Sequence, residues 1–302
     1  MNIAFVGLGS MGSSMAANLV RSGFAVTGYD KAPEALGALE SVGGRVAQSA
    51  AAAAANAEVL ILMVVNATQA EHVLFDEAAL DSLPASGIVI LMATCAPGRV
   101  QALAARVKAT GRRFVDAPVS GGVAGARAAS LSIMAAVDAA TLDQVRPALG
   151  AMGGKIFHVG TEPGQGAAVK AVNQLLCGVH LAAAAEALAL ARKAGIEPAV
   201  ALEILGGSAA SSWMLKDRGP RMMESDPVVT SAVDIFVKDL DIVLEAGREA
   251  KAALPLAAAA HQMFLAASGR GDGAVDDSQV IRSYTLLNSG SDKVDGEERR
   301  SA

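Results

Sequence analysis

The stretch GQGAAVKAVNQLLCGVHLAAAAEALALARKAG, residues Gly164 to Gly195, predicts a single long helix. Lys193 in its last turn suits the negative end of a helix dipole, and Gly195 is the residue type that most often follows a helix. Alanine, leucine and valine occupy every face, which is typical of a helix buried in a large core or against another subunit.

The N-terminal half of this helix carries three polar residues on one face. Lys170, Asn173 and Gln174 are three and four positions apart, so their side chains converge. Burial of an unpaired ammonium is costly, which favours a chemical role for Lys170. The alternative is a lysine that extends to solvent at the start of the helix, and the helix alone does not decide between the two.

The N-terminus has the pattern of a dinucleotide-binding unit. An apolar strand, NIAFV, runs directly into GLGSMG, a helical segment follows, and a second strand, AVTGYD, ends at Asp30. In such units the first glycine, Gly7, permits a tight turn and the second, Gly9, brings the backbone close to the pyrophosphate. The third, Gly12, lets the helix pack on the strand.

The same unit predicts which nicotinamide cofactor is used. The N–H groups near Ser10 and Met11 are expected to face a phosphate at the positive end of the helix. Asp30 can accept hydrogen bonds from the ribose 2′-OH and repel a 2′-phosphate, so NAD is predicted as the cofactor, although Lys31 beside it could soften the choice. The alternative is a glycine turn without a nucleotide.

Two further buried strands end at candidate cofactor contacts. EVLILMVV ends with Val64 and Val65 and is followed by Asn66, at the strand edge where ligands bind in such sheets. GIVILM is followed by Thr94, which could contact the cofactor or cap the next helix.

Strand and helix patterns alternate through residues 1–160, which predicts an α/β fold with a doubly wound, mostly parallel sheet. The alanine run Ala50–Ala55 is interpreted as an exposed helix. After residue 164 only helical patterns remain. The predicted organisation is a Rossmann-type domain, an inter-domain helix, an all-α domain for substrate and oligomerisation, and a disordered tail, with bounds 1–163, 164–195, 196–288 and 289–302.

Composition excludes several classes of protein. A net charge of −5 in 302 residues argues against a nucleic-acid surface. Mean hydropathy is +0.39, but polar residues interrupt every apolar run before the roughly 18 residues of a membrane helix. Two cysteines and no basic leader fit a cytoplasmic protein. Four scattered histidines give no metal-ligand spacing, so no metal is predicted.

A nicotinamide enzyme that oxidises an alcohol needs a proton acceptor and groups that hold the substrate. Lys170 is the candidate acceptor, because burial favours the neutral, basic form of a lysine. Asn173 and Gln174 could bind a substrate hydroxyl. Two other segments have a chemical and a structural interpretation: Ser120, Gly121 and Gly122 could cradle a carboxylate or form an ordinary turn, and Lys238 could be a second cation or pair with a neighbouring aspartate.

Four motifs in this order resemble the β-hydroxyacid dehydrogenase family, which includes 3-hydroxyisobutyrate dehydrogenase and tartronate semialdehyde reductase. They are VGLGSMG, DAPVSGG at 116–122, GQGAAVKAVNQ at 164–174 and VKDL at 237–240. The resemblance implies that Lys170 is the catalytic lysine and that Ser120, Gly121 and Gly122 hold the substrate carboxylate. It also implies that Thr94 and Lys238 contact the cofactor and that the chain forms a homodimer or homotetramer.

The chain departs from the family pattern where a second asparagine usually follows the lysine. Gln174 stands there, so which amide reaches the substrate is open. The runs NQLLCGVHLAAAAEA and SAVDIFVKDL most resemble the L-threonate dehydrogenase subgroup, which oxidises the C2 hydroxyl of a four-carbon sugar acid. Two other interpretations, a non-catalytic nucleotide-binding relative and an imine reductase, are disfavoured because both are expected to lack the lysine.

Overall fold

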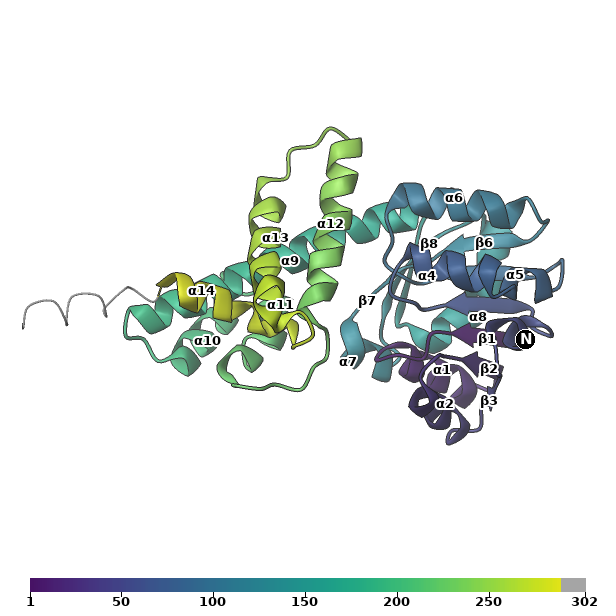
Figure 1. Cartoon of the computed structure of the whole chain (residues 1–302), viewed down its shortest axis with the longest axis horizontal. Coiled ribbons are helices and arrows are strands. Elements are labelled where there is room, and N and C mark those ends of the chain that lie inside the picture. The colour runs from purple at the N-terminus through teal and green to yellow at the C-terminus, as the bar shows by residue number, and fades with distance from the viewer. Residues whose placement is uncertain (289–302) are drawn as a thin grey trace, which may run out of the picture. The chain divides into compact units, whose positions relative to one another are not determined.

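The computed structural model describes residues 1–288, so the predicted tail 289–302 lies outside the described residues. The chain divides into two compact units. Unit 1 is Met1–Asn173 with Glu245–Lys251, and unit 2 is Gln174–Leu244 with the described residues from Ala252 on. Figure 1 shows unit 1 as a sheet covered by helices and unit 2 as a group of helices.

Unit 1 begins as a strand–helix–strand repeat. Its first elements are β1 (Asn2–Val6), α1 (Gly12–Arg21), β2 (Ala25–Tyr29), α2 (Pro33–Glu40) and β3 (Arg45–Val46). β1 pairs in parallel with β2, so the carboxyl ends of both strands meet at one edge of the sheet. The sequence did not predict β3, because its two residues are too few to form an apolar run.

The remaining elements of unit 1 complete a nine-stranded sheet. They are α3 (Ala50–Ala54), β4 (Val59–Leu62), α4 (Ala67–Glu71), the π-helix η1 (His72–Asp76), α5 (Ala79–Ser82), β5 (Ile88–Leu91), α6 (Pro97–Lys108), β6 (Arg113–Asp116), β7 (Val119–Ser120), α7 (Gly122–Arg127), β8 (Ser132–Ala136), α8 (Ala139–Met152) and β9 (Lys155–Gly160). The strand order is β3-β2-β1-β4-β5-β6-β8-β7, with β9 paired to β8. Among the described strands, the antiparallel pairings are those of β8 with β6 and with β7, while β9 pairs in parallel with β8. The other pairings are parallel, which confirms the predicted doubly wound, mostly parallel sheet.

Both faces of the sheet are buried under helices. Successive residues of β1 belong to different cores, Ile3 and Phe5 to one and Ala4 and Val6 to the other. The second core includes three alanines of α3, so the interpretation of Ala50–Ala55 as an exposed helix is wrong. Alanine side chains are short enough to let a helix lie close to the strands, and here they line that contact.

Helix α9 (Gln165–Lys193) confirms the predicted long helix. Gly195 has φ of +74° beyond its end, and the Ile196 N–H donates to the Ala191 carbonyl at 2.9 Å, which closes the last turn. The helix is apolar and long enough to cross a membrane, but half of its most apolar window is buried inside the protein. The core helix of a globular protein meets the same criteria.

Unit 2 is built from helices throughout its described residues. After α9 these are α10 (Pro198–Gly207), α11 (Trp213–Arg218), η2 (Arg221–Met223), α12 (Val233–Glu249), α13 (Pro255–Ala267), η3 (Ser268–Asp272), η4 (Asp277–Val280) and α14 (Ile281–Asn288). The rings of Phe236 and Phe264 stack with centroids 5.1 Å apart, which joins α12 to α13. The Arg218 Nε donates to the buried Asp277 carboxylate at 2.8 Å, which joins α11 to η4.

Candidate active site

The loop between β1 and α1 adopts a conformation that requires glycine. Gly7 has φ of +95°, and a Cβ there would lie 2.3 Å from the Met63 carbonyl oxygen. A Cβ on Gly12 would lie 1.9 Å from the Gly7 carbonyl oxygen, because α1 begins against the loop itself. The tight turn and the close helix packing expected of these two glycines are therefore both present.

Gly9 has a different environment, one that suits a phosphate. A Cβ built on Gly9 would meet no atom within 4 Å. Helix α1 begins just beyond Ser10 and Met11, and no side chain among the described residues caps its first turn. An open space beside an uncapped helix N-terminus fits the pyrophosphate of a dinucleotide, because the first N–H groups of a helix point outward and carry positive charge.

Asp30 is held beside this loop at the carboxyl end of β2. Its Oδ2 accepts a hydrogen bond from the Leu8 N–H at 2.6 Å, and its Oδ1 accepts one from the Ala32 N–H at 2.9 Å. A carboxylate oxygen can accept more than one hydrogen bond, so Asp30 can also bind a ribose hydroxyl. The structure thus holds Asp30 beside the glycine loop, and its contact with the ribose stays a prediction.

Val64, Val65 and Asn66 follow β4 at the same edge of the sheet. The Asn66 Oδ1 accepts a hydrogen bond from the Gln69 N–H at 2.9 Å and so caps α4. The Gln69 Oε1 in turn accepts one from the Val65 N–H at 2.9 Å. This reciprocal pair holds the segment rigid. Side-chain contact of Asn66 with the cofactor remains a prediction, and its oxygen already has a structural partner.

Thr94 lies between β5 and α6, also at the carboxyl edge of the sheet. Ala96 occupies the N-cap position of α6, and its side chain makes no capping hydrogen bond. The alternative role of Thr94 as a cap for the next helix also stays a prediction. Thr94 is half-buried, and its predicted contact with the cofactor stands as a prediction.

The Ser120–Gly121–Gly122 segment joins β7 to α7 through two left-handed residues. Gly121 has φ of +132° and Gly122 has φ of +61°. A Cβ on Gly122 would meet no atom within 4 Å, whereas one on Gly121 would meet Leu131 Cδ2 at 3.1 Å. A non-glycine residue would strain this turn, and the open side at Gly122 leaves room for a small ligand. These features support the carboxylate-binding prediction.

Asp116, the first residue of the DAPVSGG motif and not among the predicted site residues, anchors the start of α9. Its Oδ2 accepts hydrogen bonds from the Gly164 N–H at 2.9 Å and the Ala167 N–H at 3.0 Å. Burial raises the pKa of this carboxyl to about 6, against the lowering effect of those bonds. A Cβ on Gly166 would lie 2.9 Å from the Asp116 carbonyl oxygen, so α9 begins tightly against β6. The sequence feature that could have identified Asp116 is a carboxylate at the end of an otherwise apolar, buried strand.

Lys170 lies one turn beyond that anchor. It is buried, with a relative exposure of 6%, so the alternative of a lysine that extends to solvent is not what the structure shows. The Lys170 Nζ donates to the Asn173 Oδ1 at 3.4 Å, and both residues belong to unit 1. The predicted convergence of an ammonium and an amide on one face of the helix is therefore present for this pair.

Gln174 and Lys238 both contact the same buried carboxylate in unit 2. The Gln174 Nε2 donates to the Asp239 Oδ2 at 2.6 Å, and the Lys238 Nζ forms an ion pair with the Asp239 Oδ1. Asp239 is 3% exposed. The alternative interpretation of Lys238, a pair with a neighbouring aspartate, is thus realised. This link between α9 and α12 was not visible in the sequence, because the partners are 65 positions apart.

The predicted site residues therefore gather in separate sets within the two units. Unit 1 holds the glycine loop with Asp30, the two strand-end segments, the serine–glycine turn, and Lys170 with Asn173. Unit 2 holds Gln174 and Lys238 on Asp239. Among residues 1–288 no cluster of three metal-binding side chains is present, and none of the predicted roles uses one.

The family models and the curated relative that match this chain are all dehydrogenases. Residues 2–160 match the family model for the NAD-binding domain of 6-phosphogluconate dehydrogenase. Residues 164–284 match that for the NAD-binding domain of NADP-dependent 3-hydroxyisobutyrate dehydrogenase. An L-threonate dehydrogenase from Cupriavidus necator is 42% identical over 284 residues, which cover 94% of this chain and 96% of that protein.

Two solved structures share the fold over nearly their whole length. A 3-hydroxyisobutyrate dehydrogenase from Salmonella typhimurium matches with a TM-score of 0.89 and 38% identity, covering 93% of this chain and 99% of that one. A 3-hydroxyisobutyrate dehydrogenase from Mycobacterium tuberculosis, solved with L-serine, matches with a TM-score of 0.82 and 32% identity, covering 95% and 99%.

Proposed function

We propose that this chain, which belongs to the β-hydroxyacid dehydrogenase family and is an NAD(P)-binding dehydrogenase, oxidises the C2 hydroxyl of L-threonate with NAD. The observation that carries the reaction type is Lys170, a buried lysine one turn beyond the anchored start of α9. Similarity along almost the entire chain to an L-threonate dehydrogenase supports the choice of substrate.

The residues of unit 1 suit the cofactor in two places. The open backbone at Gly9 and the start of α1 would hold the pyrophosphate, and Asp30 would bind the adenosine ribose and disfavour a 2′-phosphate. When bound, NAD supplies a nicotinamide C4 that accepts a hydride. Thr94, Val64, Val65 and Lys238 are proposed to complete the cofactor contacts.

Lys170 is proposed to act as the general base. The C2 hydrogen of the substrate leaves with its electron pair as a hydride, and the hydroxyl proton passes to the neutral Lys170 Nζ. The C2–O bond becomes a carbonyl, so the products are 2-oxo-tetronate, reduced cofactor and a proton. Because Asp116 fixes the first turn of α9, the amine is held in place before substrate arrives.

Substrate binding is assigned to the serine–glycine turn and to the amide beside Lys170. The Ser120–Gly122 turn is proposed to hold the carboxylate through its serine hydroxyl and backbone N–H groups. Asn173, whose oxygen lies 3.4 Å from the Lys170 Nζ, is proposed to bind a substrate hydroxyl. Gln174 is proposed to contribute more through Asp239, to which its nitrogen already donates, than by direct contact.

A panel of hydroxy acids tests the substrate assignment. L-Threonate, its four-carbon epimers, 3-hydroxyisobutyrate and L-serine would each be assayed with NAD and with NADP, following the absorbance of the reduced nicotinamide. The expected result is the highest kcat/KM for L-threonate, because a site built around substrate hydroxyls rejects analogues that lack them by roughly 10⁴-fold. A higher kcat/KM for 3-hydroxyisobutyrate would overturn the assignment and favour the activity named for the Salmonella relative. Tartronate semialdehyde reduction is the remaining alternative, tested in the reverse direction.

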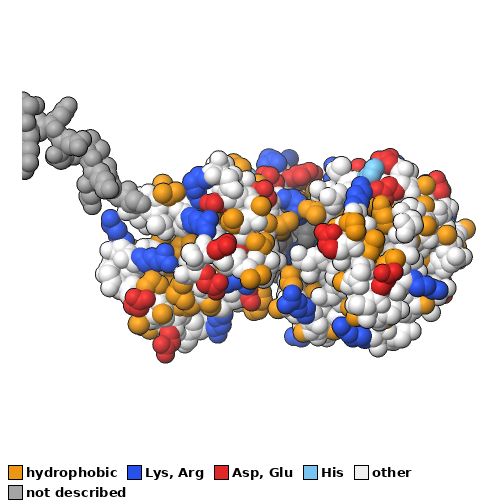
Figure 2. All heavy atoms as spheres, turned by 60° about the horizontal axis from the view of Figure 1, so that its bottom comes forward, with side chains coloured by type: hydrophobic (Ala, Val, Ile, Leu, Met, Phe, Trp, Pro, Cys, Tyr) orange, Lys and Arg blue, Asp and Glu red, His pale blue; other side chains and the backbone are white. Residues whose placement is uncertain are grey.

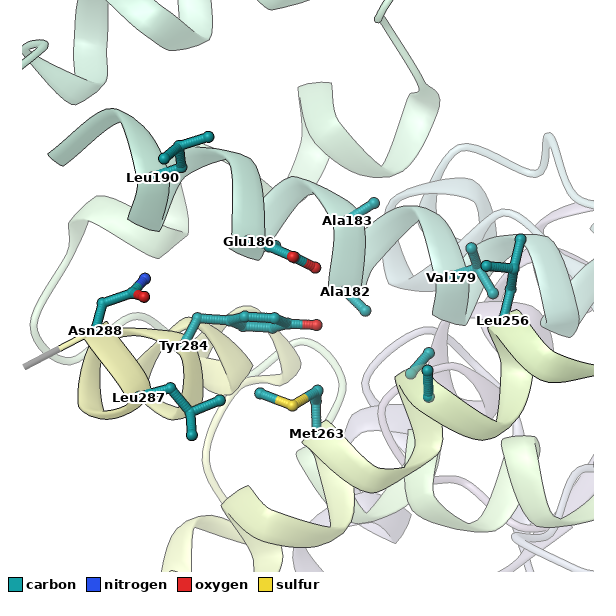
Figure 3. Close-up of a pocket in the computed structure, with 12 residues that line it drawn as sticks. Val179, Ala182, Ala183, Glu186, Leu190, Leu256, Met263, Tyr284, Leu287 and Asn288 are labelled. Atoms are coloured by element: carbon teal, nitrogen blue, oxygen red, sulfur yellow. The ribbon is translucent and has the colours of Figure 1, made fainter. Parts of the chain in front are cut away.

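We also propose that the chain forms a homodimer or homotetramer through unit 2. Hydrophobic side chains gather on the visible face of this unit (Figure 2). A groove of about 510 Å³ lies between α9, α13 and α14, lined mainly by alanine, leucine and methionine. Figure 3 shows the Tyr284 ring and the Glu186 carboxylate pointing into it. The rim of the groove carries three exposed leucines, which favours an apolar occupant. They are Leu190, Leu256 and Leu287, with exposed fractions of 64%, 68% and 74%.

The proposed occupant of the groove is a second copy of the chain. The groove lies along α9, an apolar helix whose most apolar window is only half buried within one chain. Light scattering should give a multiple of the monomer mass at micromolar concentration, and Leu190→Glu should reduce it. A monomeric wild-type chain would refute this proposal. The cytoplasm is the proposed location, in keeping with a content of two cysteines, which is too low for a disulfide framework.

A further inference from the structure

Lys31, the residue directly after the ribose-binding candidate, is engaged by a carboxylate from another element. The Lys31 Nζ lies 3.2 Å from the Glu77 Oε1, and Glu77 follows η1 after a separation of 46 positions in the chain. The lysine side chain is 67% exposed and the glutamate side chain is 18% exposed. Both residues belong to unit 1.

Glu77 is held in place by further contacts. Its Oε1 also lies 3.1 Å from the His72 Nε2, and the other nitrogen of that ring lies 3.0 Å from the Asp76 Oδ2. The Glu77 N–H donates to the His72 carbonyl at 2.9 Å. The Glu77 Oε2 is buried and has no hydrogen-bond partner among the described residues. The carboxylate is therefore fixed toward Lys31 and His72.

The position of Lys31 gives this ion pair a consequence for cofactor choice. NADP differs from NAD by a phosphate on the ribose 2′-oxygen, beside which Asp30 would lie. A lysine adjacent in the chain is well placed to offset the repulsion between Asp30 and that phosphate. Glu77 forms an ion pair with this lysine, so the compensating positive charge is neutralised in advance.

We propose that Glu77 is a determinant of cofactor specificity that acts through Lys31 to disfavour NADP. The proposal deepens the function proposed above, since it concerns the same cofactor site, but it does not depend on the identity of the substrate. Glu77 acts here as a positioning residue. Asp30 excludes the 2′-phosphate directly, and Glu77 prevents the neighbouring lysine from reversing that exclusion.

Calorimetric binding of NAD and NADP without substrate tests the proposal. Glu77→Gln should tighten the binding of NADP relative to that of NAD by about three- to five-fold, the range expected when an exposed ion pair is removed. Glu77→Lys should exceed that change. Lys31→Ala should weaken NADP and leave NAD unchanged, and Glu77→Gln introduced into Lys31→Ala should then have no further effect on the ratio of the two dissociation constants.

Asp76→Asn is the matched control, because Asp76 contacts His72 on the same turn while Glu77 is the partner of Lys31. It should leave the ratio within about 1.5-fold of wild type, since a solvent-exposed carboxylate is screened. The proposal is overturned if Glu77→Gln leaves the NADP to NAD ratio unchanged. It is overturned equally if the shift persists in Lys31→Ala, or if Asp76→Asn reproduces it. A general loss of fold would weaken both cofactors alike, and a wrong substrate would leave these binding constants untouched.

Discussion

Replacing Asp116 by alanine and by asparagine should distinguish the effect of its hydrogen bonds to the start of α9 from the effect of its negative charge. In Asp116→Ala the N–H groups of Gly164 and Ala167 lose their shared acceptor at a buried helix start. A buried donor without a partner costs about 1–3 kcal/mol, so the variant should lose about 2–5 kcal/mol of unfolding free energy. Asp116→Asn retains an oxygen acceptor of the same shape and should lose much less.

The same pair of variants should differ in catalysis. Lys170 follows Ala167 by one turn, and a shift of about 1 Å in a catalytic group costs about 10²-fold in rate. Asp116→Ala should therefore lower kcat by about 10- to 100-fold at temperatures where it is folded. NAD affinity should stay within about two-fold, because the glycine loop is a separate element. Steady-state kinetics and calorimetry measure both, and a wild-type kcat in Asp116→Ala would refute the anchoring role.

The pH dependence of stability provides a further check on Asp116. Burial raises its pKa from the ordinary 3.8 to about 6, so folding favours the protonated carboxyl. This contribution is complete below the unfolded pKa and is lost as the pH rises through the folded pKa. Asp116→Asn does not titrate, so the unfolding free energy of wild type relative to it should fall by about 2 kcal/mol between about pH 4 and 7. Urea unfolding at both pH values measures the difference, and a rise with pH would contradict the burial argument.

Three other substitutions have defined outcomes. Lys170→Ala should lower kcat by about 10²–10⁴-fold with NAD binding preserved, and a near wild-type kcat would remove this lysine from the mechanism. Asp30→Asn should weaken NAD and reduce its preference over NADP, whereas an unchanged ratio of kcat/KM values would show that Asp30 does not select the cofactor. Gln174→Leu should destabilise the chain by about 1–3 kcal/mol, because the buried Asp239 carboxylate loses a donor at 2.6 Å. Thermal unfolding without loss of Tm would contradict that role.

The fold was predictable because local sequence patterns determine its helices and strands. Continuous apolar strands, the glycine loop and the abrupt end of strand signals after residue 160 are properties of neighbouring residues, and each corresponds to an observed element. The strand β3 was not predicted, because its two residues have no such pattern. The alanine run of α3 was placed at the surface for a related reason, since alanine is compatible with either environment and only the packing decides.

The candidate site was predictable only where chemistry and position coincide in a short motif. The positive φ values of Gly7, Gly121 and Gly122 are compatible with their residue type. The burial of Lys170 was one of two interpretations that its helix left open. The partners of Asp116 and Asp239 lie 48 and 65 positions away, so no motif contains both ends of either contact. Such carboxylates are visible only once the chain is folded.

Isotope transfer from C2 of the substrate distinguishes oxidation at C2 from oxidation at another carbon. L-Threonate carrying deuterium at C2 would be oxidised with NAD, and the reduced cofactor would be analysed by mass spectrometry. Oxidation at C2 should place one deuterium on the reduced nicotinamide and should lower kcat/KM if hydride transfer limits the rate. Deuterium at C3 should have neither effect. Deuterium transfer from C3 alone, or reduced cofactor without any deuterium, would contradict oxidation at C2.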